Sequence, residues 1–314
     1  HFGVSFPETF HAESRWRNGI GKKMAPFVIA GQGELLLTVG GVAERLSAKV
    51  SFIDPSLSLG EVPEVNTWVR ATGTVRRDAK PPIRLAAAGP LHYQSGALQW
   101  RVQPEARIAI PEPYARPSES PLRLTLRDEA QLVWRVDEEW KASLARWRVE
   151  APEWKLGKRR VALGTSLIEL RQLKGKGNRW EASGRFTADS LQGFIGAGEF
   201  PSLAVEGRFT AGPEQVAISA VAKSPGLSVT LSATHRLEEQ TGAAHWQLDP
   251  VVLRPEEFSL ASLYAPWPFP FDVGKGSIEA VGNLRWGTGT EANLWGEFDL
   301  KAEGLGGFYG ELLF

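Results

Sequence analysis

The chain of 314 residues contains no cysteine, and its charges cancel, because 36 Lys and Arg residues balance 36 Asp and Glu residues. Without cysteine there is no disulfide bond, no thiolate metal site and no cysteine nucleophile, and the absence fits an oxidising compartment. A protein that binds nucleic acid normally presents a basic surface. We therefore expect no nucleic-acid partner.

Long apolar runs are missing as well. No stretch approaches the roughly 18 consecutive apolar residues of a membrane-spanning helix, and the best run, 35–42, is interrupted by Thr38, Gly40 and Gly41. The chain begins at His1 without an initiator methionine and stops just after three apolar residues, 312–314. We expect it to be a fragment of a longer protein, with any membrane anchor outside the fragment.

Signatures of catalysis are also scarce. None of the five histidines forms a close ligand pair, and the glycines at 19–21 lack the Ser or Thr that a phosphate-binding loop requires. No nucleophile elbow is present. Glycosidase carboxylates can come from distant positions, but nothing singles out two acids here. The sequence therefore predicts no enzyme, no cofactor and no metal site.

What the chain does contain is a recurring eight-residue frame with Gly at its fourth position. It occurs as EASGRFTA (181–188), AVEGRFTA (204–211), EAVGNLRW (279–286) and NLWGEFDL (293–300), with a looser copy, RATGTVRR, at 70–77. Residues on both sides of each Gly alternate between apolar and polar, as in a β-strand with one dry face. The central Gly predicts a kink, a bulge or a close approach to the backbone.

Most of the remaining chain also reads as strands. Four prolines between 111 and 121 predict a boundary, which gives an N-terminal β segment at 1–117 and a continuing segment at 118–314. We expect a leading helix at Glu8–Lys23, a short helix near 190–198 and a helical insertion near 255–264. The aromatic and proline-rich stretch 267–271 predicts an extended strap that cannot join a central ladder.

One-faced strands can bury their dry faces in three ways. Two sheets can form a sandwich, one sheet can close on itself, or one sheet can curl into a trough that holds a lipid. An empty trough would expose a large apolar patch, which soluble proteins rarely tolerate. The predicted fold is mainly β, an elongated and curled antiparallel sheet that forms a half-pipe groove, with one or two short helices.

The C-terminal third resembles a bacterial family. The strap at 267–272, then Gly274 and the strand 276–286, together with the sequence LGGFYGELLF at 305–314, are similar to YdbH-type members of the AsmA-like superfamily. The specific similarity covers residues 250–314. The repeated frame is typical of AsmA-like proteins generally.

The resemblance implies a bridge-like lipid transfer protein in the periplasm of a Gram-negative envelope. In such proteins a β-groove holds phospholipid acyl chains while the headgroups stay in water. An N-terminal anchor attaches them to the inner membrane, and YdbH-type members are associated with an outer-membrane lipoprotein. The anchor and the partner-binding region would lie outside this chain.

We expect the groove to be lined by alternating residues of the clearest strands. These are Trp180, Phe186, Leu227, Val229, Leu231, Ile278, Leu284, Trp286, Leu294, Phe298 and Leu300. The same residues could instead fill a closed core between two sheets. The alternative function is then a non-enzymatic β-sandwich scaffold or binding module for a glycan or a protein partner.

Overall fold

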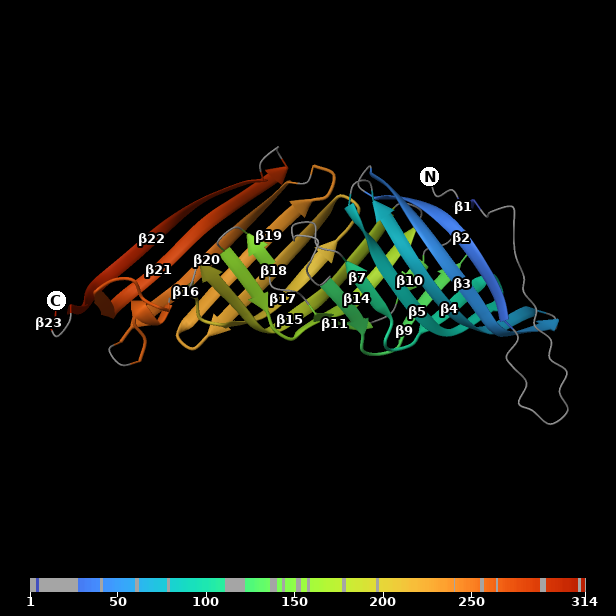
Figure 1. The fold of residues 1–314 in the computed structure, drawn as a ribbon, viewed down its shortest axis with the longest axis horizontal. Coiled ribbons are helices and arrows are strands. Elements are labelled where there is room, and N and C mark those ends of the chain that lie inside the picture. Colours follow the sequence, from blue (N-terminus) through green and yellow to red (C-terminus); the bar gives the residue numbers. More distant parts are fainter. Residues whose placement is uncertain are drawn as a thin grey trace. The chain divides into compact units, whose positions relative to one another are not determined.

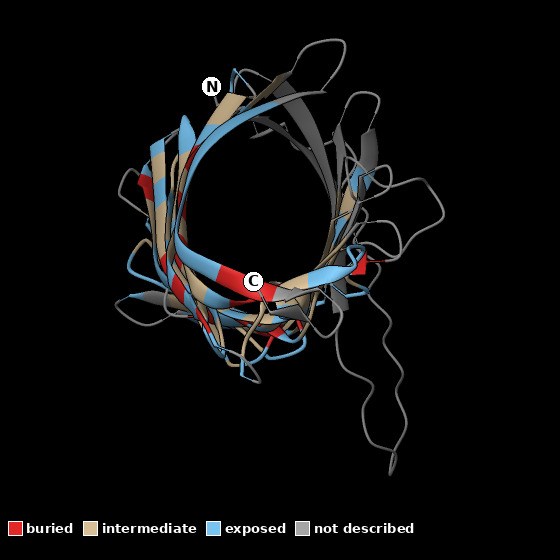
Figure 2. Ribbon diagram, turned by 90° about the vertical axis from the view of Figure 1, so that its left-hand side faces the viewer, coloured by how far each residue is buried: buried red, intermediate tan, exposed pale blue. Residues whose placement is uncertain are grey.

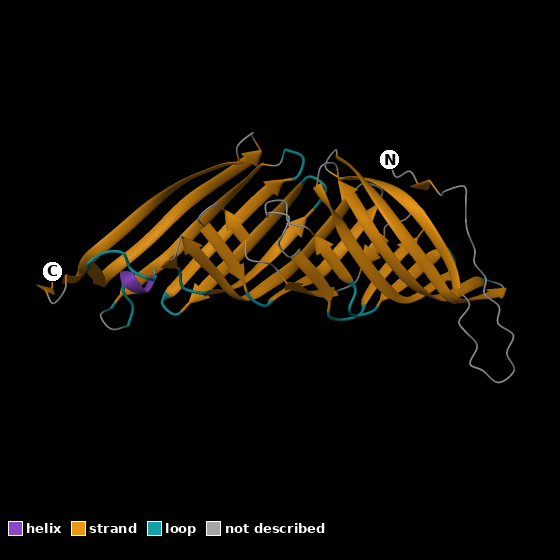
Figure 3. Ribbon diagram, in the orientation of Figure 1, coloured by secondary structure: helices purple, strands orange, loops and turns teal. Residues whose placement is uncertain are grey.

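The computed structural model is built almost entirely of antiparallel β-strands (Figures 1 and 3). It describes residues 4–5, 28–39, 42–59, 62–77, 80–110, 122–135, 140–142, 145–150, 154–156, 159–176, 179–195, 198–239, 241–254, 257–263, 265–288, 292–309 and 312–313. Within these residues there is no α-helix, and the one helical turn is the 3₁₀ helix η1 (Leu260–Leu263). The predicted mainly-β, curled antiparallel architecture is confirmed.

The chain divides into two compact units. The first unit draws on residues 1–113, 120–149 and 168–184, and the second on 150–167 and 185–314. The first contains β1 (Val4–Ser5), β2 (Val28–Val39), β3 (Val42–Leu59), β4 (Pro63–Arg77), β5 (Lys80–Gln94), β6 (Ala97–Val102), β7 (Arg107–Ile110), β8 (Leu122–Leu126), β9 (Ala130–Arg135), β10 (Trp140–Ala142) and β11 (Ala145–Glu150).

The second unit follows the same plan of consecutive, paired strands. It contains β12 (Trp154–Leu156), β13 (Arg159–Leu163), β16 (Gly198–Glu199), β17 (Leu203–Ala211), β18 (Gln215–Ser224), β19 (Leu227–Arg236), β20 (Thr241–Leu253), β21 (Phe271–Thr288), β22 (Ala292–Tyr309) and β23 (Leu312–Leu313). Three strands contribute residues to both units: β11, through Glu150, β14 (Ser166–Lys176) and β15 (Arg179–Ile195).

Several strands of the first unit are interrupted in the middle. Both β6 and β7 pair with β5, and β6 pairs with β9 while β7 pairs with β8. The register is continuous across the gap, since Val102 lies opposite Ala130 and Arg107 opposite Thr125. Thus β6–β7 and β8–β9 are two long neighbouring strands whose interruptions lie side by side.

Backbone hydrogen bonds keep these interruptions within the sheet. The Leu126 amide donates to the Ala106 carbonyl at 2.9 Å, and the Arg127 amide donates to the Arg146 carbonyl at 2.8 Å. A bulge that adds residues on one strand bends that strand and increases its twist. The extra residues lie on β6–β7 relative to β5, because Leu91 is opposite Trp100 whereas Ala86 is opposite Arg107, and this shift bends the sheet at the interruption.

The prolines between 111 and 121 lie outside the described residues, but the strands on either side of them pair with each other. Ile110 lies opposite Leu122 within the first unit. The proline-rich stretch therefore connects two neighbouring strands of one unit. The division expected at residue 117 stays a prediction.

The three expected helices have different outcomes in the structure. The expected helix at Glu8–Lys23 lies outside the described residues. The short helix expected near 190–198 is wrong, because β15 continues to Ile195 and Leu191 pairs with Leu163 of β13. In the insertion expected near 255–264, the helical structure of the described residues is limited to the four-residue turn η1. At 190–195, pairing with a neighbouring strand decided the outcome, and the local sequence could not reveal that pairing.

Few of the described residues are buried (Figure 2), and some of the buried apolar side chains form two small clusters. In the first unit the cluster is Ala106, Leu126 and Ala145. In the second unit it is Val251, Leu253, Val273 and Ile278. Along β17, half-buried and exposed residues alternate strictly, as expected for a strand with one dry and one wet face.

Candidate functional site

Cross-strand registers bring most of the expected lining residues onto one face of the second unit. Residues directly opposite one another in antiparallel strands point to the same side of a sheet. Leu231 lies between Ala220 and Trp246, and Trp246 is opposite Gly282, which is opposite Phe298. We call this surface the apolar face of the second unit.

Nine expected lining residues lie on this face by register. They are Leu227, Val229, Leu231, Ile278, Leu284, Trp286, Leu294, Phe298 and Leu300. Phe186 joins them from β15, because its ring lies over Gly207, on the side where a Cβ of Gly207 would point. Trp180 is half-buried in β15 and belongs to the first unit. The sequence alternation therefore identified one shared face across β17 to β22.

The exposure of the face changes along and across the sheet. Phe298 is 67% exposed and Leu300 is 61% exposed, whereas Ile278 is buried in the core cluster with Leu227 packed against it. The remaining members are half-buried, apart from Leu294, whose side chain lies outside the described residues. One part of the face is thus a closed core and another part is open.

A covering segment, residues 257–263 and 265–270, closes one end of the face. Phe258, Leu260 and Leu263 pack onto the buried cluster. Ala265 exchanges backbone hydrogen bonds with Glu199 of β16, at 2.7 and 2.9 Å. The Ala261 amide also donates to Asp272 Oδ1 at 2.9 Å. Hydrogen bonds at Ala261 and Ala265 therefore hold the covering segment in place, and it explains why Leu227 and Ile278 are shielded while Phe298 is not.

Glycines of the repeated frame lie beneath large apolar side chains. A Cβ placed on Gly207 would lie 2.4 Å from the Phe186 ring, and one on Gly282 would lie 2.6 Å from the ring of Trp246. A Cβ on Gly296 would lie 2.7 Å from Leu284. Such approaches are possible only where the neighbour has no side chain. The frame therefore lets large side chains lie close against the backbone of the next strand.

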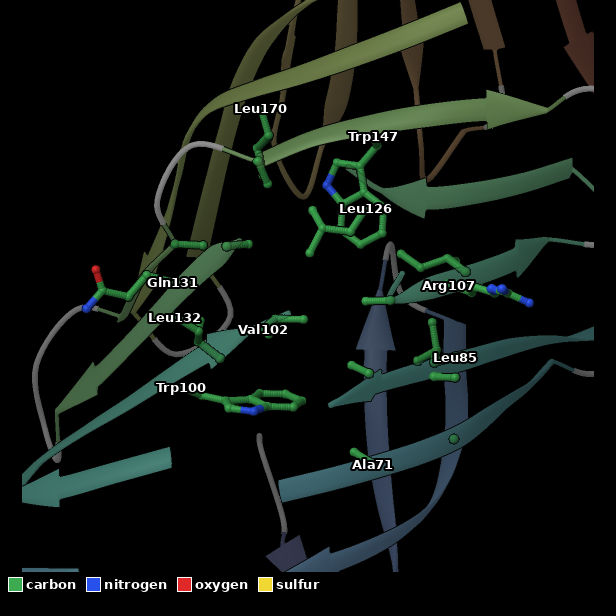
Figure 4. A pocket seen from close by; sticks show the side chains of 18 of the residues that line it. Ala71, Leu85, Trp100, Val102, Arg107, Leu126, Gln131, Leu132, Trp147 and Leu170 are labelled. Carbon is green, nitrogen blue, oxygen red and sulfur yellow. The ribbon is translucent and has the colours of Figure 1, made fainter. Parts of the chain in front are cut away.

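The first unit contains an apolar cavity of about 400 Å³ that sequence reasoning did not identify (Figure 4). Its wall comes from strands as far apart as β4 and β14, so the sheet of this unit curls around it. Its lining residues are Ala71, Thr72, Gly73, Leu85, Ala86, Ala87, Trp100, Val102, Ala106, Arg107, Ile108, Leu126, Ala130, Gln131, Leu132, Ala142, Ala145, Trp147, Leu170 and Leu173.

Two features give this cavity its apolar character. The side chains of Arg107 and Gln131 point away from its centre, while Trp100, Leu126 and Trp147 point into it (Figure 4). Seven alanines supply much of the remaining wall, and their small side chains leave the space open. The sequence signal that could have indicated this cavity is the run of alanines at 86–88, which lies next to an alternating strand pattern.

Charged side chains gather on the opposite side of β21 and β22. Lys301 Nζ lies 2.8 Å from Glu303 Oε1 and 3.3 Å from Glu279 Oε1. Hydrogen bonding to Glu303 and then to Glu279 raises the pKa of Lys301, and the hydrogen bond from Lys301 lowers the pKa of Glu303. These groups are exposed, so they mark the wet face and add little stability.

Among the described residues, no group of three or more His, Asp or Glu side chains is placed to hold a metal ion. No helix in the described part of the chain is long and apolar enough to cross a membrane. What the site offers is apolar surface, with polar groups confined to its rim and to the other face.

No protein-family model matches the chain, and no curated protein or solved structure compared with it matches either.

Proposed function

We propose that the chain is a periplasmic segment of a bridge-like intermembrane phospholipid transport protein. It would hold acyl chains on its apolar sheet surfaces between the inner and outer membranes. The observation that carries the proposal is the one-sided character of the second unit, whose apolar face ends in the exposed side chains of Phe298 and Leu300. The apolar cavity of the first unit gives independent support.

Hydrocarbon is the ligand that such surfaces bind best. Transfer of an acyl chain from water gains about 0.8 kcal/mol for each methylene group that is buried. Soluble proteins rarely leave contiguous apolar patches uncovered, and an acyl chain on the face would shield the rings of Trp246 and Phe298. A sheet face provides no enclosed polar pocket, so headgroups would remain in water.

The wider setting of the proposal comes from the family resemblance. The segment would be attached to the inner membrane through an anchor outside this chain, and an outer-membrane lipoprotein would be its partner. It would work without a catalytic residue, a cofactor or nucleic acid. Transport would then depend on lipid moving along apolar surface.

Lipid extraction tests the proposal directly. The purified chain is extracted with organic solvent, and the released lipids are identified by mass spectrometry against a mock purification. We expect phospholipid in stoichiometric amount. A folded protein that carries no more lipid than the mock sample would contradict the proposal.

A matched pair of variants tests where the lipid lies. Phe298→Asp places a charge on the apolar face, and Trp295→Asp places one on the opposite face of the same strand, where Trp295 is 52% exposed. Both side chains are exposed, so neither change should unfold the chain. We expect Phe298→Asp alone to reduce co-purified phospholipid several-fold. Equal reduction in both variants would argue against binding on this face.

A non-enzymatic β-sandwich scaffold for a glycan or a protein is the second candidate. The observation in its favour is the closed core in which Leu227 and Ile278 lie beneath the covering segment. It predicts a lipid-free, folded chain. The extraction experiment therefore separates the two functions.

A further inference from the structure

The apolar face of the second unit carries a titratable side chain, His235. It lies opposite Val216 on one side and Gly242 on the other, and Gly242 is opposite Trp286. The described residues that surround it on this face, such as Ala233, Ala244 and Leu284, have no titratable group. A polar ring on an otherwise apolar surface needs a reason, because an unpaired polar group there is costly.

Trp286 reaches across β20 to hold this ring. Its indole Nε1–H donates a hydrogen bond to His235 Nδ1 at 3.1 Å. The two rings are stacked, with 6.2 Å between their centroids and 17° between their planes. The contact depends on Gly242, since a Cβ there would lie 2.2 Å from the Trp286 ring.

This hydrogen bond fixes the tautomer of the imidazole. An imidazole nitrogen that accepts a hydrogen bond carries no proton, so neutral His235 has its proton on Nε2. Among the described residues, the one hydrogen bond of the His235 side chain is the one at Nδ1. His235 Nε2–H is therefore a hydrogen-bond donor that meets no acceptor in the described part of the chain, on a half-buried ring of the apolar face.

We propose that His235 Nε2–H binds an acceptor oxygen at the polar end of a lipid whose acyl chains lie on the apolar face. Trp286 is the positioning residue that keeps the donor on Nε2. The site lies where β19 ends, one residue before Arg236, whose guanidinium pairs with Glu239 at 3.0 Å. An amphipathic ligand would thus have its polar end near water and its chains over Leu231 and Leu284. The inference rests on the proposed function and adds a contact for the ester or phosphate oxygens.

Two probes separate the polar contact from the apolar one. Dihexanoylphosphatidylglycerol has ester and phosphate oxygens, whereas pyrene is a fluorescent hydrocarbon that has no acceptor oxygen. Binding of both is measured for the full chain, for His235→Phe and for His245→Phe. His245 is the matched control, because it is an exposed histidine on the opposite face and bonds Asn283 at 3.0 Å.

For His235→Phe we expect affinity for the phospholipid to fall about tenfold, as for loss of one hydrogen bond from a neutral donor. Pyrene affinity should stay unchanged, and His245→Phe should resemble the wild type with both probes. The ether-linked analogue of the phospholipid, which lacks ester carbonyls, identifies the acceptor. If His235→Phe loses as much affinity for the ether analogue as for the ester lipid, the acceptor is the phosphate. If it loses no affinity for the ether analogue, the acceptor is the ester carbonyl.

Unchanged phospholipid affinity in His235→Phe, with both probes binding the wild type, would overturn the inference and leave the proposed function standing. Failure of the wild type to bind either probe would instead remove the proposed function and the inference with it. A long-range ¹⁵N–¹H NMR spectrum gives a test that needs no variant of His235. The Nε2–H tautomer is expected in the wild type and a mixture in Trp286→Phe, and an Nδ1–H tautomer in the wild type would overturn the inference.

Discussion

At the scale of single residues, glycine controls how closely large side chains approach the sheet. Trp246 over Gly282, Phe186 over Gly207 and Trp286 over Gly242 repeat one arrangement on different strands. In each case the missing Cβ leaves room for a ring to lie against the backbone of the neighbouring strand. The repeated frame thereby keeps bulky residues from filling the space above the apolar face.

Gly282→Ala should destabilise the chain by about 1–3 kcal/mol, because overpacking forces side chains and backbone to shift. The new Cβ would lie 2.6 Å from Trp246 and 2.7 Å from the Glu297 carbonyl oxygen, which is backbone and cannot rotate away. The free energy of unfolding is measured by chemical denaturation. Gly287→Ala on the same strand is the control, since its nearest atom is 3.5 Å away. Equal effects of the two changes would contradict this explanation.

Residue-scale features were partly predictable. The sequence predicted a kink, a bulge or a close approach to the backbone at the repeated glycines, and the structure shows the close approach at Gly207, Gly282 and Gly296. It did not predict which side chain approaches, because Phe186 and Trp246 come from neighbouring strands. Only the cross-strand register can supply that information.

At the scale of elements, interruptions in neighbouring strands line up. The break between β8 and β9 contains Asp128, whose carboxylate accepts hydrogen bonds from Arg146 of β11 at 2.5 and 3.1 Å. The hydrogen bond from Arg146 lowers the pKa of Asp128. The ion pair therefore supports the backbone hydrogen bond from Arg127 to Arg146 at the edge of the cavity wall.

Asp128→Asn should cause a small loss of stability that depends on pH. A carboxyl group whose pKa is lower in the folded state stabilises above its unfolded value, about 3.9, and this contribution is lost as the pH falls through the folded pKa. Unfolding is measured by denaturant from neutral pH to below pH 4. The difference between wild type and variant should shrink on acidification. High salt should also shrink it, since the pair is exposed. A difference that grows on acidification would contradict the role given to the pair.

Strand existence was predictable at this scale, and strand continuity was not. Period-two alternation located strands such as those of the frames at 204–211 and 279–286, which the structure shows within β17 and β21. The extension of β15 through 190–195 followed from pairing with β13, which lies about 30 residues earlier. Local propensity is a weak guide where a partner strand decides.

At the scale of the whole molecule, the two units share one design. Each buries few residues completely, and each has an apolar surface: a cavity in the first unit and an open face in the second. The absence of net charge means that no strong electrostatic attraction draws a charged partner. Binding would depend on apolar contact.

Binding of phospholipid should therefore stabilise the folded chain. A ligand at 100 times its dissociation constant adds about 2.7 kcal/mol when it binds only the native state. We expect dihexanoylphosphatidylglycerol to raise the thermal unfolding midpoint in a concentration-dependent way. Glycerol phosphate, which has no acyl chains, is the control. Equal shifts with both compounds, or none with either, would contradict stabilisation through acyl chains.

The sequence by itself determined the mainly-β class, the one-sided strands and which side chains of one strand share a face, because alternation along each strand depends only on local order. Tertiary structure alone decided which part of the face is closed and which is open. Ile278 and Phe298 look alike in an alternating pattern, yet one lies beneath Phe258 and Leu260 and the other is 67% exposed. The segment that covers a strand can be distant from it in the chain, and the wall of the first unit's cavity is likewise built from distant strands. Their placement depends on bulges and registers that no local pattern records.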